Sequence, residues 1–557
     1  MKIVQKRSRR EKYSRFIWLF VAVLLLAGVF FIGQSRPDSI LPADWEDIQR
    51  SLRLGSSDNE LPALVIDMAY AEYDQLLSQR EEALSSGVVL AGPQDFVPAD
   101  MQYEDETIPV RMRLQQGAAD HLGDDEKWNY EIRTRNDQLL ADIQRFYLID
   151  PADNNWLNEW AFNETLRREG LVAGRYKFVR LFMNGDYQGI YALQEGFAPE
   201  LISGNARQEG VFVEFDAEPL WETIALYEGD YQNAAADPIS NLSAADFQFF
   251  EVDTFRDAAI ADDPVLTAQK DKAIGLLRGL QSGELPASEV FDVEKYGRFL
   301  ALADLWAASE ATSLINLRYY FNPESGLLEP VGFNANSFGS ADRISMSAAY
   351  HDPALQTAYV LAAQRMTQPE YLEELESSLQ KEIETLRQAL TAESDVGLPW
   401  DLLEQRQGDM SRSLHPLQPL FAYLGPPTLA QEGIIQIDVA NVLNLPLEII
   451  GFDIDGATFL EVDPSWIQSG QEELAANDER RIILQAHAND QLPVVSYIRF
   501  HIPLTEILSR DSELDFMREM DIQVATRIVG LEDIQMTSAR PGYPDPLTGQ
   551  LDPASGQ

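Results

Sequence analysis

The order of apolar and polar positions divides the central part of the chain into a β-rich region followed by a helical one. Lys127 to Thr134 alternates cleanly between apolar and polar residues, which predicts a half-buried strand. Tyr371 to Leu390 instead repeats leucine and isoleucine at three- and four-residue spacing, which predicts one long amphipathic helix. Helical patterns also extend over Asp263 to Leu314. We therefore expect an α+β domain over about residues 61–400.

The segment RYKFVRLFMNGDYQGIYALQE, Arg175 to Glu195, predicts a β-hairpin. Two runs rich in β-branched and aromatic residues are separated by Asn184-Gly185, the pair that best tolerates the positive φ angles of a type I′ turn. Glu195 follows the end of the second strand. A solvated carboxylate is the ordinary interpretation of that position, and a functional carboxylate is the alternative.

The composition changes near Gly425, where a Gly-Pro-Pro sequence indicates a domain boundary. Residues 401–429 are expected to form a linker. Short apolar runs separated by turn residues predict a small β-sandwich over residues 430–537. The last stretch, residues 538–557, is rich in Pro, Gly and Asp and is expected to be a flexible tail.

One apolar run predicts a transmembrane helix over residues 16–33. Residues 1–15 before it carry seven Lys and Arg against one Glu, which keeps the amino terminus in the cytoplasm. A polar stalk over residues 34–60 would then lead to extracytoplasmic domains, as in a single-pass signal anchor of a bacterial inner membrane facing the periplasm. A cleaved signal peptide is the alternative.

The charge and the cysteine count exclude several classes of protein. The 557 residues include 90 acidic and 43 basic ones, a formal net charge of −47, and such a surface repels nucleic acid. The chain has no cysteine, which excludes disulfides, thiolate metal sites and cysteine nucleophiles. P-loop, zinc-protease and serine-hydrolase motifs are also missing. The expected partners are the membrane, through the amino-terminal helix, and a protein or envelope component of unknown identity.

Three segments resemble the CotH kinase family, the spore-coat-protein-H-like atypical kinases. Arg175 to Glu195 is similar to the family pattern R-Y-x-F-V-x-x-x-x-N-G-x-Y-x-G-x-Y-x-L-x-E. Arg111 to Arg133 is similar to R-L-K-G-D…D-H…K-W-S-x-R, and Ile315 to Asn334 to N-x-R-x-Y-x-N-P…L-E-P-I-x-[FY]-D. The resemblance covers about Leu61 to Ser394. It implies a kinase-like bilobal fold, with a β-rich amino-terminal lobe and a helical carboxy-terminal lobe, and ATP and Mg²⁺ as cofactors.

The resemblance also implies roles for two charged residues on the β-rich side. Kinase chemistry needs a lysine that positions the nucleotide phosphates and a carboxylate that positions the lysine. Lys127 is the implied phosphate lysine, and Glu195 is its implied partner. A solvated strand residue remains the alternative interpretation of Lys127.

On the metal side, the resemblance implies Asn316 and Asn334 as ligands. The family pattern has an aspartate where this chain has Asn334, and a neutral amide is a weaker ligand for Mg²⁺ than a carboxylate. Gln115-Gln116-Gly117 also departs from the family's lysine-containing segment, and Glu310 stands where a histidine is common. These departures indicate lost or altered catalysis. The alternative is a rearranged catalytic site built on Asp304 and Glu310.

Three hypotheses on function remain open at this stage. The first is an envelope-anchored, CotH-kinase-like pseudokinase with a degenerate metal and nucleotide site and a binding or scaffold role. The second is an active ATP- and Mg²⁺-dependent phosphotransferase that modifies a protein or envelope acceptor. The third is a structural envelope protein whose β-domain supplies the interacting surface.

Overall fold

The computed structural model describes residues 61–541 apart from residues 105, 120, 124–126, 137, 227–249, 339–351, 392, 395, 426–432, 471–473, 475–480, 487–496 and 507–520. The chain divides into two compact units, Met1–Glu60 and Leu61–Gln557, and every described residue belongs to the second. None of the described helices is long and apolar enough to cross a membrane. The transmembrane helix predicted over residues 16–33, with its tail and stalk, lies outside the described residues.

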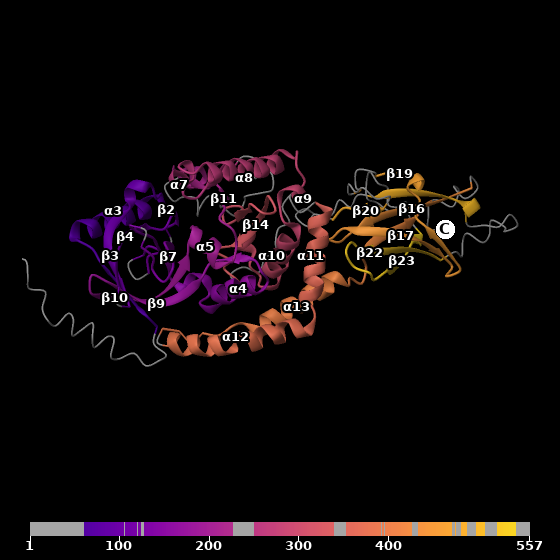
Figure 1. Cartoon of the computed structure of the whole chain (residues 1–557). Helices are drawn as coiled ribbons and strands as arrows, with labels where there is room; N and C mark the ends of the chain where they lie inside the picture. Colours follow the sequence, from indigo (N-terminus) through magenta and orange to yellow (C-terminus); the bar gives the residue numbers. More distant parts are fainter. Residues whose placement is uncertain are drawn as a thin grey trace, which may run out of the picture. The chain divides into compact units, whose positions relative to one another are not determined.

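The first part of the second unit is a closed seven-stranded β-barrel, drawn in indigo and purple in Figure 1. The strand order is β1-β3-β4-β6-β7-β10-β9, and β1 closes the sheet by pairing in parallel with β9. Because side chains alternate along each strand, Val110, Ile132 and Phe146 point inward, and all three are fully buried. The barrel strands are β1 (Ala63–Asp67), β3 (Val97–Tyr103), β4 (Glu106–Leu114), β6 (Tyr130–Thr134), β7 (Arg145–Ile149), β9 (Tyr176–Met183) and β10 (Asp186–Glu195).

The hairpin formed by β9 and β10 confirms the turn predicted at Asn184-Gly185. Asn184 has φ 50° and Gly185 has φ 91°, so both central residues occupy the left-handed region that a type I′ turn requires. A further register shift lies between Tyr187 and Gly189, where Gly189 has φ 104°. Helix α3 (Tyr70–Ser86) adds Leu76 to the barrel core, and β2 (Val88–Val89) pairs with β5 (Gly117–Ala118) beside it.

Most of the second sheet and most of the helices follow the barrel in the chain, although residues 157–173 lie between two barrel strands (Figure 1). The sheet has the order β12-β11-β13-β14-β8. The core beside it includes Phe299 of α10 and Trp306, which follows that helix and packs against Phe162 of α4. The strands are β8 (Val172–Ala173), β11 (Phe212–Phe215), β12 (Val252–Thr254), β13 (Arg318–Asn322) and β14 (Leu327–Gly332). The helices are α4 (Leu157–Arg168), α5 (Pro199–Gly204), α6 (Glu218–Leu226), α7 (Asp257–Ala261), α8 (Pro264–Ser282), α9 (Ala287–Val290), α10 (Val293–Leu305), α11 (Pro353–Met366), α12 (Pro369–Leu390) and α13 (Trp400–Leu414).

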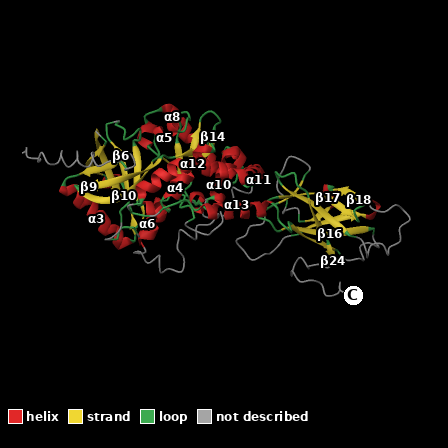
Figure 2. Cartoon of the chain, turned by 90° about the horizontal axis from the view of Figure 1, so that it is seen from below, coloured by secondary structure: helices red, strands yellow, loops and turns green. Residues whose placement is uncertain are grey.

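The carboxy-terminal part consists of two packed sheets, whose strands are yellow in Figure 2. Phe452 of one sheet contacts Phe500 of the other, with ring centroids 5.4 Å apart. The segment 401–429, expected to be a linker, holds most of α13 and the first strand of this part. One sheet contains β15 (Leu420–Leu424), β16 (Ile434–Asn441), β19 (Ile467–Ser469), β21 (Ile498–Pro503) and β24 (Arg540–Pro541), and the other contains β17 (Leu447–Ile454), β18 (Thr458–Glu461), β20 (Ile482–Leu484), β22 (Ile522–Ile528) and β23 (Gln535–Ser538).

The predicted fold class is therefore corrected. The described chain is α+β, but the strands of its first part close into a seven-stranded barrel, so the prediction of a kinase-like bilobal domain is wrong. The physical reason is that alternation along one strand predicts the strand but not its neighbours. The pairing that closes the barrel joins Val65 to Phe182, and no local pattern encodes such a distant contact. The transmembrane helix predicted before that domain lies outside the described residues.

Candidate functional site

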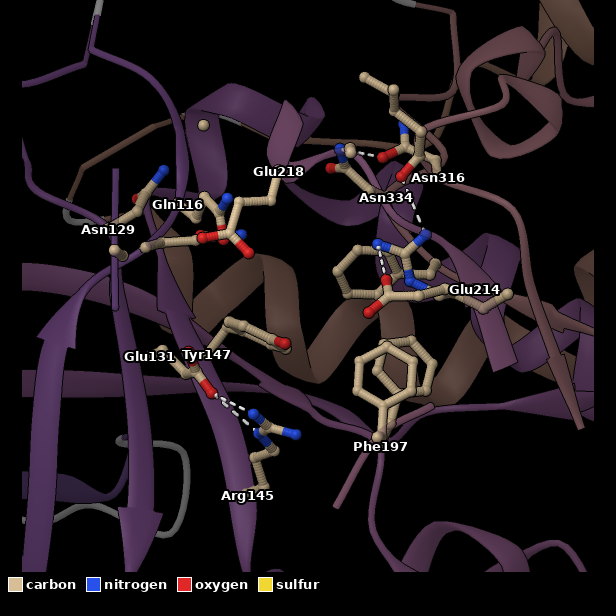
Figure 3. Close-up of a pocket in the computed structure, with 18 of the residues that line it drawn as sticks. Gln116, Asn129, Glu131, Arg145, Tyr147, Phe197, Glu214, Glu218, Asn316 and Asn334 are labelled. Carbon is tan, nitrogen blue, oxygen red and sulfur yellow. Dashed lines mark hydrogen bonds and ion pairs between the residues drawn. The ribbon is translucent and has the colours of Figure 1, made fainter. Parts of the chain in front are cut away.

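A cavity of about 2050 Å³ separates the outer face of the barrel from the second sheet and its loops (Figure 3). Residues of β4, β6 and β7 line it on the barrel side. The other side is lined by Glu214 of β11, Arg318 of β13 and residues 309–310 and 312–317. The site is therefore built from strands and loops that lie far apart in the sequence.

The barrel side of the cavity carries a charge cluster around Glu131. Arg113 Nη2 lies 2.7 Å from Glu131 Oε2, and Arg145 Nη2 lies 2.7 Å from Glu131 Oε1. Arg133 Nη2 contacts the same Oε1 atom at 2.8 Å. Burial alone would raise the pKa of Glu131, but the three arginines outweigh it and hold the pKa at about 2. Glu131 is thus ionised at neutral pH. Its strand was predicted from alternation, whereas its three partners were not.

The opposite side of the cavity carries one ion pair within an aromatic cluster. Arg318 Nη2 lies 2.7 Å from Glu214 Oε2, and the guanidinium lies 5.4 Å from the centroid of Phe333 and 5.9 Å from that of Phe197. Burial raises the pKa of Glu214, although Arg318 opposes the change. The rings and the carboxylate together fix the plane of the guanidinium.

The predicted metal ligands Asn316 and Asn334 meet in this cavity. Asn334 Nδ2 lies 3.5 Å from Asn316 Oδ1, a contact that Figure 3 marks with a dashed line. Asn316 Nδ2 donates to the carbonyl of Glu310 at 3.1 Å, and Asn336 Nδ2 donates to Glu310 Oε1 at 2.7 Å. Burial raises the pKa of the Glu310 carboxyl despite the hydrogen bond from Asn336. Three amides and one carboxylate therefore form a connected polar group.

A buried carboxylate, Glu159 of α4, holds the backbone beside these amides. Glu159 is 0% exposed, and its Oε2 accepts hydrogen bonds from the backbone N–H groups of Ala335 at 3.0 Å and Asn336 at 3.2 Å. Asn334 and Asn336 have φ 48° and 43°, left-handed values that asparagine tolerates better than most residues. Sequence reasoning missed Glu159. The available signal was one acid inside the apolar helical run LNEWAF.

Lys127 lines the cavity, but its carboxylate partner is not Glu195. Lys127 Nζ lies 2.7 Å from Glu393 Oε2 and 2.9 Å from the carbonyl oxygen of Ile190. Glu195 Oε1 instead lies 2.6 Å from Arg175 Nη2, the residue that opens the same hairpin. The predicted pairing of Lys127 with Glu195 is therefore corrected, because Arg175 lies closer to Glu195 across the hairpin.

The other predicted catalytic residue, Asp304, does not line the cavity. Its carboxylate forms an ion pair with Arg406 and accepts a hydrogen bond from Tyr359 Oη at 2.7 Å. Those contacts join α10 to α11 and α13. Four of the six predicted site residues line the cavity, and these are Lys127, Glu310, Asn316 and Asn334.

The side chains near Asn334 could hold Mg²⁺ only in a site with little negative charge. Mg²⁺ prefers oxygen ligands and is normally held by at least one carboxylate. Glu310 supplies the carboxylate, and Asn316 and Asn334 supply amide oxygens. Glu310 Oε1 and Asn316 Oδ1 already accept hydrogen bonds from neighbouring amides, so a cation would have to displace them. Within the described ranges, no group of three or more histidine or acidic side chains is arranged to hold a metal.

No family model matches the chain, and a search of curated proteins finds no similar sequence.

Proposed function

We propose that the protein is an envelope protein, anchored through the apolar run at residues 16–33, whose cavity binds an anionic ligand of the nucleotide class. Its role in this proposal is binding or scaffolding in an extracytoplasmic compartment. The observation that carries the proposal is the convergence of Lys127, Glu310, Asn316 and Asn334 on one cavity. The three segments that resemble the CotH kinase family give the ligand class.

One contact favours binding over phosphoryl transfer. The amide of Asn334 points its Nδ2 atom toward Asn316 Oδ1, so the oxygen of Asn316 accepts a hydrogen bond and the two side chains do not present two free oxygens to a cation. The ion pair between Lys127 and Glu393 is compatible with both binding and phosphoryl transfer, because kinase chemistry itself needs a carboxylate that positions the lysine. Transfer of a phosphoryl group depends on positioned cations, which stabilise the charge of the transition state.

The second candidate is an active phosphotransferase, and Glu310 is the observation in its favour. Its carboxylate lines the cavity and is bonded to Asn336 beside the predicted metal ligands. A carboxylate there would supply the charge that Asn334 lacks. In this alternative, Glu310 rather than Asp304 is the catalytic acid, because Asp304 is paired with Arg406 outside the cavity.

Asn334→Asp is the experiment that tests the proposal. The full chain in detergent is titrated with ATP and Mg²⁺ by calorimetry, and phosphoryl transfer is followed with labelled ATP. We expect the wild type to bind ATP without measurable transfer. Asn334→Asp should strengthen Mg²⁺-dependent binding by roughly tenfold, about 1.4 kcal/mol, because a carboxylate adds charge to the cation site.

Two further variants control this experiment. Gln418→Glu also adds one negative charge, on an exposed residue outside the cavity, and should leave the affinity unchanged. Lys127→Ala combined with Asn334→Asp should remove the gain, since phosphates and metal are held together. Phosphoryl transfer by the wild type that is lost in Glu310→Gln would support the phosphotransferase instead. An absence of ATP binding in every variant would refute both candidates.

A further inference from the structure

Four arginines occupy one wall of the cavity, on three neighbouring barrel strands. Arg111 of β4 is paired in register with Arg133 of β6, and Arg133 is paired with Arg145 of β7. Arg113 follows on the same face of β4, two residues beyond Arg111, and all four line the cavity. We call these four residues the arginine wall. Like charges placed directly opposite each other normally destabilise a sheet.

One carboxylate does not neutralise this wall. Glu131 pairs with Arg113, Arg133 and Arg145, so this group of four side chains keeps a formal charge of +2 before Arg111 is counted. Burial lowers the pKa of the Arg133 guanidinium, and repulsion from Arg145 and Arg113 adds to this change while Glu131 opposes it. The chain has 90 acidic residues and 43 basic ones, so an excess of positive charge on one wall is contrary to its overall composition.

The arginine wall also keeps unused hydrogen-bond donors. Glu131 accepts from Nε and Nη2 of Arg133 and of Arg113, and Arg113 Nη1 donates to the carbonyls of Ala91 and Gly92. Arg145 Nε also donates to Glu131, as Figure 3 shows. Within the part of the chain that the structure describes, Nη1 of Arg133 and Nη1 of Arg145 form no hydrogen bond. Their side chains are 35% and 13% exposed, so both remain accessible to a small ligand.

The wall is held in place before any ligand binds. The guanidinium groups of Arg113 and Arg133 lie 4.5 Å and 4.4 Å from the centroid of the Phe96 ring, which restricts their planes. Glu131 fixes their positions along the strands. The two oxygens of Glu131 can accept hydrogen bonds from all three arginines, but its single negative charge leaves positive charge in excess on this wall. Other acidic residues line the cavity, among them Glu214 and Asp253, but they lie on strands of the second sheet and not on the arginine wall. The surplus on the wall itself favours a ligand whose negative charge faces it, and guanidinium groups match the geometry of phosphate oxygens.

We propose that the arginine wall binds a chain of phosphate groups, with Arg133 and Arg145 supplying the free donors. Lys127 then plays a smaller part in holding the phosphates than its position in the sequence implies, because Glu393 already neutralises it. The assignment of these phosphates to a nucleotide rests on the proposed function. The binding of phosphate groups by the arginine wall does not depend on it.

Arg133→Gln tests the inference. Glu131 keeps two arginine partners in this variant, so no buried charge is left unpaired. Sodium tripolyphosphate is titrated into the full chain in detergent by calorimetry, and the melting temperature without ligand is measured for each variant. Arg133→Gln should weaken tripolyphosphate binding about tenfold, since the variant loses a charge-assisted hydrogen bond to the ligand.

Two variants separate a specific site from general electrostatics. Arg135→Gln removes the same charge from an exposed residue that does not line the cavity, and its affinity should change less than about twofold. Arg133→Lys keeps the charge but loses the planar fork and should give an intermediate affinity. Equal losses in Arg133→Gln and Arg135→Gln would overturn the inference, because the attraction would then be non-specific.

ATP as a second ligand distinguishes this inference from the proposed function. Binding of tripolyphosphate that depends on Arg133, without binding of ATP, would support the arginine wall and refute a nucleotide ligand. ATP affinity could instead stay unchanged in the single variant Arg133→Gln and in the double variant that combines Arg111→Gln with Arg133→Gln. That result would refute the arginine wall and support the nucleotide ligand. Binding of neither ligand would refute both.

Discussion

Replacing the buried Glu159 by glutamine should change how the stability of the protein depends on pH. Glu159 is fully buried and accepts hydrogen bonds from Ala335 and Asn336, so it ties α4 to the loop that carries Asn334. Burial is the largest influence on its pKa and raises it from 4.5 to about 7, although the backbone hydrogen bonds act in the opposite direction. The nearby Glu310 carboxylate adds to the increase.

The sign of the effect follows from proton linkage. A folded pKa above the unfolded value means that the folded state binds more protons between pH 4.5 and about 7. The contribution of Glu159 to the free energy of unfolding is therefore fully present below pH 4.5 and is lost as the pH rises through about 7. The loss amounts to about 3 kcal/mol, from roughly 1.4 kcal/mol for each pKa unit.

Urea unfolding at pH 5, 6, 7 and 8 measures this loss. Glu159→Gln resembles the protonated acid and does not titrate, so the variant should gain up to about 3 kcal/mol relative to the wild type over this range. The hydrogen bonds of the new amide change the stability of the variant by the same amount at every pH. They therefore do not affect how the stability difference between the variant and the wild type depends on pH. Other acids titrate in both proteins, and they cancel in the difference. Glu209→Gln, at an exposed position, is the matched control and should show no such trend.

A flat difference between Glu159→Gln and the wild type would refute the reasoning, because Glu159 would then titrate as an exposed glutamate does. A difference of the opposite sign would mean that the backbone N–H groups of Ala335 and Asn336 stabilise the ionised form more than burial destabilises it. In that case the ionised carboxylate of Glu159 would hold the loop beside Asn334 in place.

Two other predictions concern the barrel. Gly185→Val should lower the free energy of unfolding by about 1 to 3 kcal/mol, because a β-branched residue at φ 91° is strained. Urea denaturation measures this change, and an unchanged midpoint would contradict the turn type. Glu393→Gln should destabilise the protein by about 1 to 3 kcal/mol, because it removes the charge bonded to Lys127. A double-mutant cycle with Lys127→Met should give a coupling above about 0.5 kcal/mol, and additive effects would contradict a direct interaction.

The local parts of the fold could be predicted from the sequence because short-range patterns determine them. Asn184-Gly185 gives a turn with positive φ wherever it joins two strands, and the leucine repeat of Tyr371 to Leu390 lies within α12. Closure of the barrel could not be predicted in this way. It depends on the pairing of β1 with β9, which brings together residues from opposite ends of a long segment.

The same limit explains which site residues were identified. Asn316 and Asn334 lie within one segment that has a specific sequence pattern, Ile315 to Asn334, whereas Glu393 contacts Lys127 from beyond the end of α12 and has no pattern of its own. Glu159 was missed for another reason. A glutamate in a helix is ordinarily exposed, and only the packing of α4 against the loop at Ala335 shows that this one is buried.

The charges within the cavity also determine how the Asn334→Asp experiment depends on metal. The substitution adds a negative charge to a cavity whose proposed ligand is itself an anion held by Arg133 and Arg145. Without Mg²⁺, the new carboxylate repels the phosphates, so binding of ATP should weaken relative to the wild type. With Mg²⁺, the carboxylate becomes a ligand of the cation that the phosphates share, so binding should strengthen. The effect of Asn334→Asp should therefore change sign when EDTA replaces Mg²⁺, while Gln418→Glu shows no change under either condition. Equal effects with and without Mg²⁺ would mean that residue 334 influences the ligand only through its charge, and that Asn316 and Asn334 are not the cation site.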